Sequence, residues 1–165
     1  VERPALIVPY ANPAWIVGYQ PMSIPAGDPS VTHGMSYDII AGNLLAYFGE
    51  ENIDASDGLE IHNVGLHMHQ LGTQANLSIE RGSGSNECLL DIPNWDFNWQ
   101  GGYFLKDTVN IYEGDKLSLQ CEWDNSAENQ PVINGEKQVP VDVEWGEGTG
   151  DEMCLGILYV TEPKE

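Results

Sequence analysis

The chain has 165 residues, which is enough for one domain with a hydrophobic core of its own. Its 26 acidic residues outnumber its 6 basic residues and give a net charge of −20, which repels nucleic acid and anionic membrane surfaces. We therefore expect neither nucleic acid nor a membrane as a partner, and no run of about 18 apolar residues is present to span a bilayer.

The beginning of the chain is rich in proline. Residues 1–30 contain six of the ten prolines and predict an extended lead-in or linker, followed by one domain at residues 31–165. The first residues lack the charged and apolar regions of a signal peptide, so we expect either a trimmed mature chain or a piece of a longer one.

Short apolar or alternating runs, divided by turn residues, follow this lead-in, and none has a helical period of any length. The strands expected from them are 35–41, 58–68, 74–81, 87–92, 102–105, 108–112, 116–124 and 152–161. About eight strands at this spacing predict an all-β fold, an antiparallel jelly-roll-like β-sandwich. Residues 125–150, rich in Asn, Gly and Glu, are expected to form a long loop near a functional site.

The stretch IHNVGLHMH carries the first candidate site. In a strand, alternation places Val64 and Met68 on the core face and His67 and His69 on the other. Two imidazoles at positions i and i+2 can converge on one metal ion, and Gly65 beside them leaves space for a ligand to approach. The alternative is a pair of ordinary surface histidines.

Two further histidines are not assigned to this site. His62 falls on the opposite face of the strand unless a bulge intervenes. His33 lies in an expected loop and has no visible partner in the sequence. Both are interpreted as structural or exposed side chains.

Three cysteines lie far apart without a Cys-x-x-Cys pair, which argues against a zinc ribbon or a thioredoxin-like motif. One disulfide and one free thiol are the simplest account, and they favour a secreted or periplasmic protein. Cys121 and Cys154 each lie on the inward face of a strand and can meet, which would turn Met153 outward beside the two histidines. A methionine in a strand is otherwise a core residue.

Four motifs, taken in chain order, resemble one known family. They are HMHQLG from His67, WDFNWQ from Trp95, GDKL from Gly114 leading to Cys121, and DEMC from Asp151. Together they resemble the C-terminal domain of the copper type II, ascorbate-dependent monooxygenases, the family of dopamine β-monooxygenase and peptidylglycine α-hydroxylating monooxygenase. The resemblance covers roughly residues 58–161.

The resemblance implies that His67, His69 and Met153 match the family's methionine-coordinated copper, where dioxygen binds, and that these ligands are also the catalytic residues. It further implies a disulfide between Cys121 and Cys154, one copper per chain, and ascorbate as the external reductant. The ligand chemistry agrees, because a soft thioether suits Cu(I), imidazole suits both Cu(I) and Cu(II), and zinc rarely uses methionine. Three protein ligands leave a coordination position for oxygen or water.

The sequence departs from the family in two places. Family enzymes carry a second copper in a preceding domain, bound by three histidines of which two are adjacent; this chain has no such pair, so we expect an upstream copper domain as a partner. Peptide-amidating members use an arginine two residues before the first ligand histidine and a tyrosine four residues after the methionine, where Gly65 and Ile157 stand here. A peptidylglycine substrate is therefore not indicated, and the substrate is an unidentified small molecule.

Two functions of different classes follow. One is the oxygen-binding copper domain of a monooxygenase that hydroxylates an unactivated C–H bond. The other is a stand-alone secreted copper-binding module for storage, delivery or scavenging. The cluster of Trp95, Phe97 and Trp99 either lines a pocket or belongs to the core, and Asp96 and Asn98 have no role that the sequence indicates.

Overall fold

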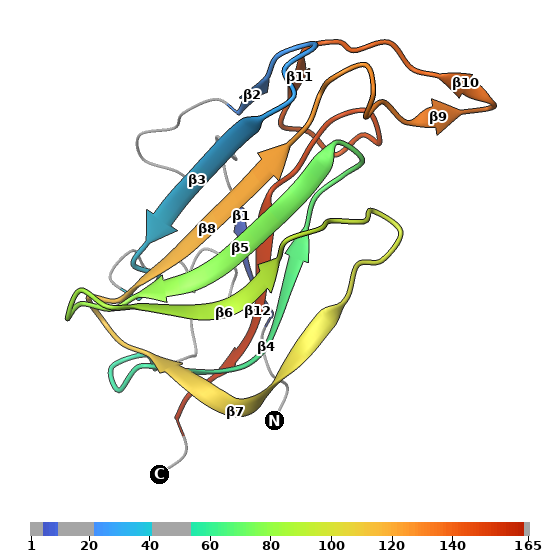
Figure 1. Ribbon diagram of the computed structural model, residues 1–165. Helices are drawn as coiled ribbons and strands as arrows, with labels where there is room; N and C mark the ends of the chain where they lie inside the picture. The colour runs from blue at the N-terminus through green and yellow to red at the C-terminus, as the bar shows by residue number, and fades with distance from the viewer. Residues whose placement is uncertain (1–4, 10–21, 41–53, 164–165) are drawn as a thin grey trace.

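The computed structural model describes residues 5–9, 22–40 and 54–163, with the backbone alone for residues 5–9, and this part of the chain contains strands and no helix. The strands are β1 (Ala5–Pro9), β2 (Ser23–Ile24), β3 (Val31–Tyr37), β4 (Leu59–His67), β5 (Gly72–Glu80), β6 (Asn86–Ile92), β7 (Gly102–Ile111), β8 (Lys116–Trp123), β9 (Val132–Ile133), β10 (Glu136–Lys137), β11 (Val143–Glu144) and β12 (Leu155–Thr161). Two four-stranded antiparallel sheets have the orders β1-β12-β4-β7 and β3-β8-β5-β6 (Figure 1). The predicted all-β antiparallel sandwich is confirmed, while its jelly-roll connectivity stays a prediction.

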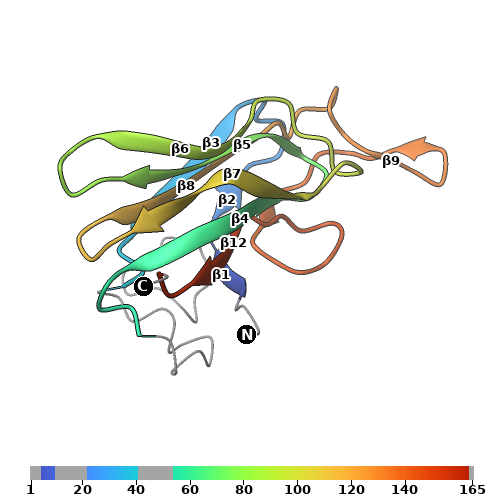
Figure 2. The ribbon, with the colours of Figure 1, turned by 90° about the horizontal axis from the view of Figure 1, so that it is seen from below.

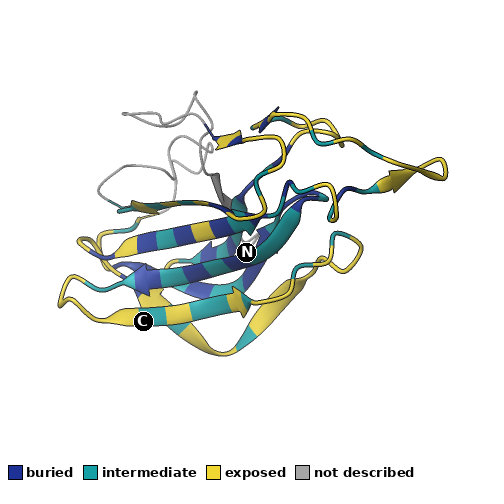
Figure 3. Ribbon diagram, turned by 45° about the horizontal axis from the view of Figure 1, so that its top comes forward, coloured by how far each residue is buried: buried dark blue, intermediate teal, exposed yellow. Residues whose placement is uncertain are grey.

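The hydrophobic core lies between the two sheets, which Figure 2 shows as two layers. Buried and more exposed residues alternate along the strands, visible as bands in Figure 3, because successive side chains point to opposite faces. On β8 the inward residues include Leu117, Cys121 and Trp123. Gly156 of β12 marks a close approach of the layers, since a Cβ there would lie 3.2 Å from Cδ1 of Leu77. The two sheets therefore pack closely against each other near the start of β12.

Strand β4 contains the bulge that the prediction for His62 allowed. Ile61 and Val64 are both fully buried, although three positions separate them, and the register shifts here against both neighbouring strands, β7 and β12. His62 is thereby turned off the core face, and its Nε2 lies 2.8 Å from Oγ1 of Thr161 and 3.5 Å from Oε2 of Glu60. Beyond the bulge the register with β12 is regular from Asn63 to His67, which fixes the face of the sheet on which His67 lies.

The two strands predicted at 102–105 and 108–112 form one strand, β7. It pairs with β4 in two parts, because residues 105–108 stand opposite His62 alone. The interruption in the pairing thus falls between the two strands that were predicted.

Strands also occur where none was predicted. β1 and β2 lie within residues 1–30, and β9, β10 and β11 lie within residues 125–150. β1 is the edge strand of its sheet, a position that accepts proline, and Pro9 is its last residue. The strand predicted at 35–41 begins already at Val31, so His33 lies on β3 and not in a loop, and residue 41 is outside the described residues.

The described residues include no helix long and apolar enough to cross a membrane.

Candidate metal centre

Two imidazole rings lie side by side where β4 ends. His67 is the last residue of β4, and His69 follows two positions later. Their ring centroids are 5.1 Å apart, and the ring planes meet at 81°. Met68 between them is fully buried, and its anchoring in the core turns both histidines to the opposite side. The structure therefore brings the two predicted histidines together.

His67 is half-buried, and its Nδ1 lies 2.6 Å from Oε1 of Gln100. Burial lowers the pKa of His67 below its ordinary value of 6.5; the hydrogen bond to Gln100 opposes this shift and the neighbouring His69 adds to it. The ring is therefore neutral at neutral pH, which is the form that binds a metal ion. Because Nδ1 is engaged, Nε2 is the nitrogen left for a ligand.

His69 is held on several sides. Its Nδ1 lies 2.8 Å from the carbonyl oxygen of Asp151, and since a carbonyl only accepts, Nδ1 carries the proton and Nε2 keeps a lone pair. Its backbone N–H donates to Oε2 of Glu152 over 2.8 Å, and its carbonyl accepts from Nε1 of Trp95 over 3.2 Å. The ring of Phe97 packs edge-on against it, with centroids 6.1 Å apart. Both rings thus have Nδ1 occupied, the arrangement in which histidine ligands are oriented towards a metal.

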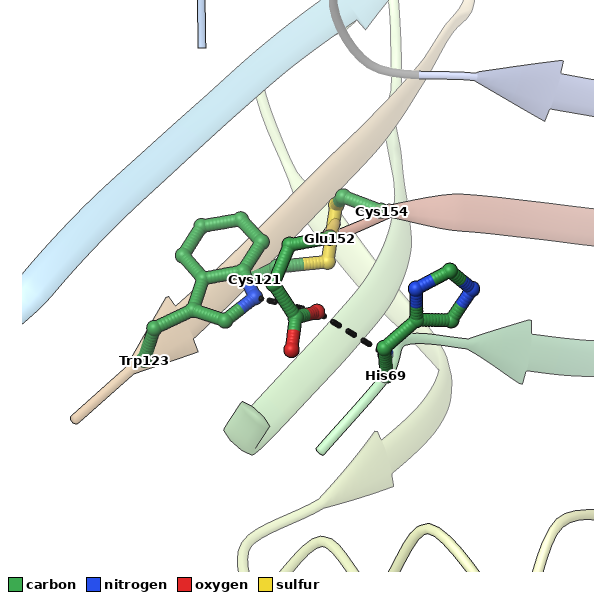
Figure 4. The surroundings of a disulfide bond; sticks show 5 residues. All are labelled: His69, Cys121, Trp123, Glu152 and Cys154. Atoms are coloured by element: carbon green, nitrogen blue, oxygen red, sulfur yellow. Dashed lines mark hydrogen bonds between the residues drawn. A yellow bond between two sulfur atoms is a disulfide. The ribbon is translucent and has the colours of Figure 1, made fainter. Parts of the chain in front are cut away.

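A buried carboxylate joins this histidine to the strand before the C-terminus. Glu152 is 1% exposed and accepts hydrogen bonds from His69 N (2.8 Å) and Trp123 Nε1 (3.0 Å), both drawn in Figure 4. It also accepts one from Leu71 N (2.7 Å). Burial raises the pKa of Glu152, and the three N–H donors oppose the rise. The residue therefore ties the segment before β12 to the segment after β4.

The disulfide between Cys121 and Cys154 adds a second tie, beside the first (Figure 4). Its Cα atoms are 6.0 Å apart, and it links β8 of one sheet to the residue just before β12 of the other. Cys88 is free and exposed on β6. The two inward cysteines meet across the layers of the sandwich.

Met153 lies between these two anchored residues. Glu152 and Cys154 are fully buried, whereas Met153 is half-buried, as alternation requires of a residue on the opposite face. Leu155 stands opposite His67 in the register of β12 and β4. Met153 precedes Leu155 by two residues. By alternation, its side chain is therefore expected on the face of the sheet that carries Leu155 and His67.

The donor set near the histidines limits which metal fits. Among the residues that the structure describes, no three His, Cys, Asp or Glu side chains converge on a common point. His33 and His62 do not extend the pair: His33 bonds to the carbonyl of Ser23, and His62 bonds to Thr161. No third His, Cys, Asp or Glu of the described residues would complete a site built on this pair, and a thioether with two imidazoles would fit copper better than zinc.

Sequence reasoning missed the residues that orient the rings. Gln100 belonged to a recognised motif, but nothing in the sequence indicated that it contacts His67, and the carbonyl of Asp151 carries no sequence signal at all. Asp96 and Asn98, which had no predicted role, form a turn: Oδ1 of Asp96 accepts from the backbone N–H of Asn98 over 2.9 Å. This turn belongs to the segment whose Phe97 and Gln100 contact the two histidines.

The tryptophans of this motif differ in their surroundings. Trp95 is half-buried and packs against the core, whereas Trp99 is 82% exposed. Both line a shallow hollow of about 370 Å³ at the open edge between β6 and β7, together with Tyr103. The predicted aromatic cluster is therefore part core and part surface.

A disulfide-bonded β-sandwich with two imidazoles side by side, each with its Nδ1 in a hydrogen bond, is a candidate metal-binding domain. Residues 49–163 match the family described as "Copper type II ascorbate-dependent monooxygenase, C-terminal domain", and the chain belongs to this family. The predicted recognition is confirmed. Copper and ascorbate dependence, and the use of dioxygen and a substrate by a monooxygenase, are properties of that family.

Curated relatives agree with the family. The chain is 26% identical to dopamine beta-hydroxylase of Canis lupus familiaris over 102 residues, 62% of this chain and 15% of the relative. It is 29% identical to DBH-like monooxygenase protein 1 of Homo sapiens over 111 residues (66% and 16%), and 26% identical to MOXD1 homolog 1 of Drosophila melanogaster over 103 residues (62% and 13%). The matched part of the chain thus spans 13% to 16% of the length of these relatives.

Proposed function

We propose that this chain is the oxygen-binding copper domain of a monooxygenase that hydroxylates an unactivated C–H bond. One copper would be held by Nε2 of His67, Nε2 of His69 and the sulfur of Met153. The observation that carries the proposal is the pair of imidazoles 5.1 Å apart, each with Nδ1 engaged in a hydrogen bond and Nε2 left to bind. Membership in a copper-dependent family supplies the identity of the metal.

The protein's own groups do the positioning. Copper, when bound, supplies a redox centre at which dioxygen is reduced with electrons that come from ascorbate. The carbonyl of Asp151 and the amide of Gln100 orient the two rings. The ring of Phe97 packs edge-on against the ring of His69, and His69 is buried. The contacts with Asp151 and Gln100 hold each ring by its Nδ1, as the partners of histidine ligands commonly do.

Met153 is the proposed third ligand because its backbone has little freedom. Glu152 is fixed by three hydrogen bonds and Cys154 by a disulfide, and both side chains point into the core. The side chain between them must point outward, on the face that carries His67. A thioether favours Cu(I) over Cu(II), which suits a site that has to be reduced before it meets dioxygen.

The proposed electron donor and substrate follow from the family and from two positions at which the sequence departs from it. The chain has no adjacent pair of histidines, so the electron for the second half of the reaction would come from an upstream copper domain. Gly65 and Ile157 are register partners on β4 and β12, and neither carries a charge or hydroxyl to hold a peptide carboxylate. We therefore propose a small-molecule substrate other than a peptidylglycine. The disulfide suits a secreted or periplasmic location.

A stand-alone copper-binding module is the second candidate, because a pair of imidazoles can hold copper without a catalytic role. Such a module would bind and release copper without forming a product. Reversible redox cycling of the bound copper, with no hydroxylated product that contains oxygen from O₂, would favour it over the monooxygenase domain.

The site is tested by titrating the copper-free protein with Cu(I) and with Cu(II) against competing chelators. We expect about one copper per chain, which the double variant His67→Ala/His69→Ala should not bind. Met153→Ile should lose at least tenfold in Cu(I) affinity and less in Cu(II) affinity, because only the soft ligand is removed. Met35→Ile, on β3 of the opposite sheet, is the matched control and should bind both ions like the unaltered protein.

Two results would contradict the assignment. Equal copper content in the double histidine variant and in the unaltered protein would show that His67 and His69 do not bind the copper. Unchanged Cu(I) affinity in Met153→Ile would show that Met153 is not a ligand, and only the two histidines would remain as proposed ligands.

A further inference from the structure

The segment Trp95–Gln100 lies against both imidazoles of the candidate centre. Trp95 donates to the carbonyl of His69 over 3.2 Å, Phe97 packs on the ring of His69, and Gln100 reaches His67. We infer that Gln100 is a positioning residue that fixes the tautomer of His67, and that the carbonyl of Phe97 determines how Gln100 does so. Its use in copper binding rests on the proposed function, whereas the tautomer itself is a property of the copper-free protein.

The inference follows from which atoms can donate. The carbonyl oxygen of Phe97 only accepts, so the atom of Gln100 that lies 2.7 Å from it must be the amide nitrogen. The other end of the same amide is then the oxygen, and it lies 2.6 Å from Nδ1 of His67. An amide oxygen also only accepts, so Nδ1 of His67 must carry the proton. Nε2 is left with its lone pair, ready for a metal ion.

The geometry of Gln100 is set by the turn before it. Asp96 Oδ1 accepts from the backbone and side-chain nitrogens of Asn98, and the backbone N–H of Trp99 donates to the carbonyl of Asp96 over 2.9 Å. The backbone N–H of Trp95 donates to the carbonyl of Thr73 over 2.7 Å, which ties the segment to β5. The polar residues of the motif therefore close a turn whose exit residue is aimed at His67.

The two histidines differ in what specifies their tautomers. His69 donates to the backbone carbonyl of Asp151, a partner that substitution of a side chain does not remove. His67 donates to a side chain, so its tautomer depends on the residue at position 100. His69 thus serves as an internal control for any change made at Gln100.

The test measures the tautomers directly. In copper-free protein labelled with ¹⁵N and held above the pH at which imidazole titrates, two-bond ¹H–¹⁵N spectra distinguish a protonated Nδ1 from a protonated Nε2. We expect both His67 and His69 to carry the proton on Nδ1. In Gln100→Leu, which removes the acceptor, His67 should populate both tautomers while His69 is unchanged. In Gln100→Glu, which keeps an acceptor, His67 should stay protonated on Nδ1.

Copper affinity gives the second readout. Loss of a partner that orients a histidine ligand commonly costs about 10- to 100-fold in metal affinity, and we expect a Cu(I) loss of that order in Gln100→Leu. Gln100→Glu should retain more of the affinity than Gln100→Leu. Trp99→Leu is the matched control, because its indole is 82% exposed and neither ring bonds to it; tautomers and affinity should be unchanged.

The outcomes separate this inference from the proposed function. A single Nδ1–H tautomer of His67 in Gln100→Leu would overturn the inference, as would an Nε2–H tautomer in Gln100→Glu. Both of these outcomes are read from spectra of copper-free protein, and the spectrum of His69 reports in each variant whether the fold around the site persists. Failure of copper binding with the expected tautomers would instead count against the proposed function.

Discussion

The disulfide between Cys121 and Cys154 should carry a large part of the stability of the domain. Replacing both residues with alanine opens a bridge whose ends are 33 positions apart in sequence. In the chain-entropy description, a bridge across a loop of that length destabilises the unfolded chain by about 3.7 kcal/mol. Domains are stable by roughly 5–15 kcal/mol in total, so the double variant should lose a large fraction of its free energy of unfolding.

The assay is urea denaturation of the copper-free protein, followed by tryptophan fluorescence. The matched control is Cys88→Ala, whose thiol is exposed and unbridged and whose removal should change the free energy of unfolding by less than about 0.5 kcal/mol. Reduction of Cys88→Ala should reproduce the loss seen in the double variant. Denatured, unreduced protein should show one free thiol per chain, and Cys88→Ala should show none.

Two results would refute this reasoning. One is a loss below about 1 kcal/mol, the size of an ordinary single substitution, both in the double variant and on reduction. The other is peptide mapping that links Cys88 to Cys121 or Cys154 in the native protein.

Two other substitutions test the close packing at Gly72 and the charge of Asp115. Gly72→Ala should destabilise the domain by about 1–3 kcal/mol and weaken copper binding, because the added Cβ would lie 3.0 Å from Cδ1 of Trp95. The control in urea denaturation is Gly150→Ala, where a Cβ meets nothing within 4 Å. Equal losses of stability in the two variants would contradict the argument. Burial acts to raise the pKa of Asp115, but two backbone N–H groups and Arg81 outweigh it and lower the pKa below 3.8. The ionised carboxylate therefore stabilises the fold above pH 3.8, and this contribution is lost as the pH falls through the lowered pKa. Asp115→Asn should cost about 1.5–3 kcal/mol at neutral pH and flatten the acid side of the stability curve, whereas an unchanged pH dependence would exclude this role.

The faces of the regular strands could be predicted from the sequence because alternation is a local property. The inward positions of Cys121 and Cys154 and the outward position of Met153 required only the period of two along β8 and the C-terminal strand. The same rule placed His67 on the face opposite Met68. These predictions did not need any knowledge of which strands are neighbours.

Features that depend on distant partners could not be predicted. The bulge in β4 is defined by its register with β7 and β12, and the sequence IHNV permits it without requiring it. The partners of the two imidazoles, Gln100 and the carbonyl of Asp151, lie 33 and 82 positions away along the chain. β1 escaped prediction because an edge strand tolerates the proline that argues against a central one.

The motif DEMC can be understood residue by residue from the contacts around it. The carbonyl of Asp151 holds the ring of His69, the carboxylate of Glu152 holds its backbone, and Cys154 fastens the strand to β8. Met153 takes part in none of these bonds. The other three residues of the motif nevertheless fix its backbone. A residue held this firmly without a structural task of its own is where a ligand would be expected, since a well-supported backbone places a donor more accurately than a mobile one does. Copper binding should therefore leave the fold of the strands nearly unchanged and affect mainly the side chains of the centre.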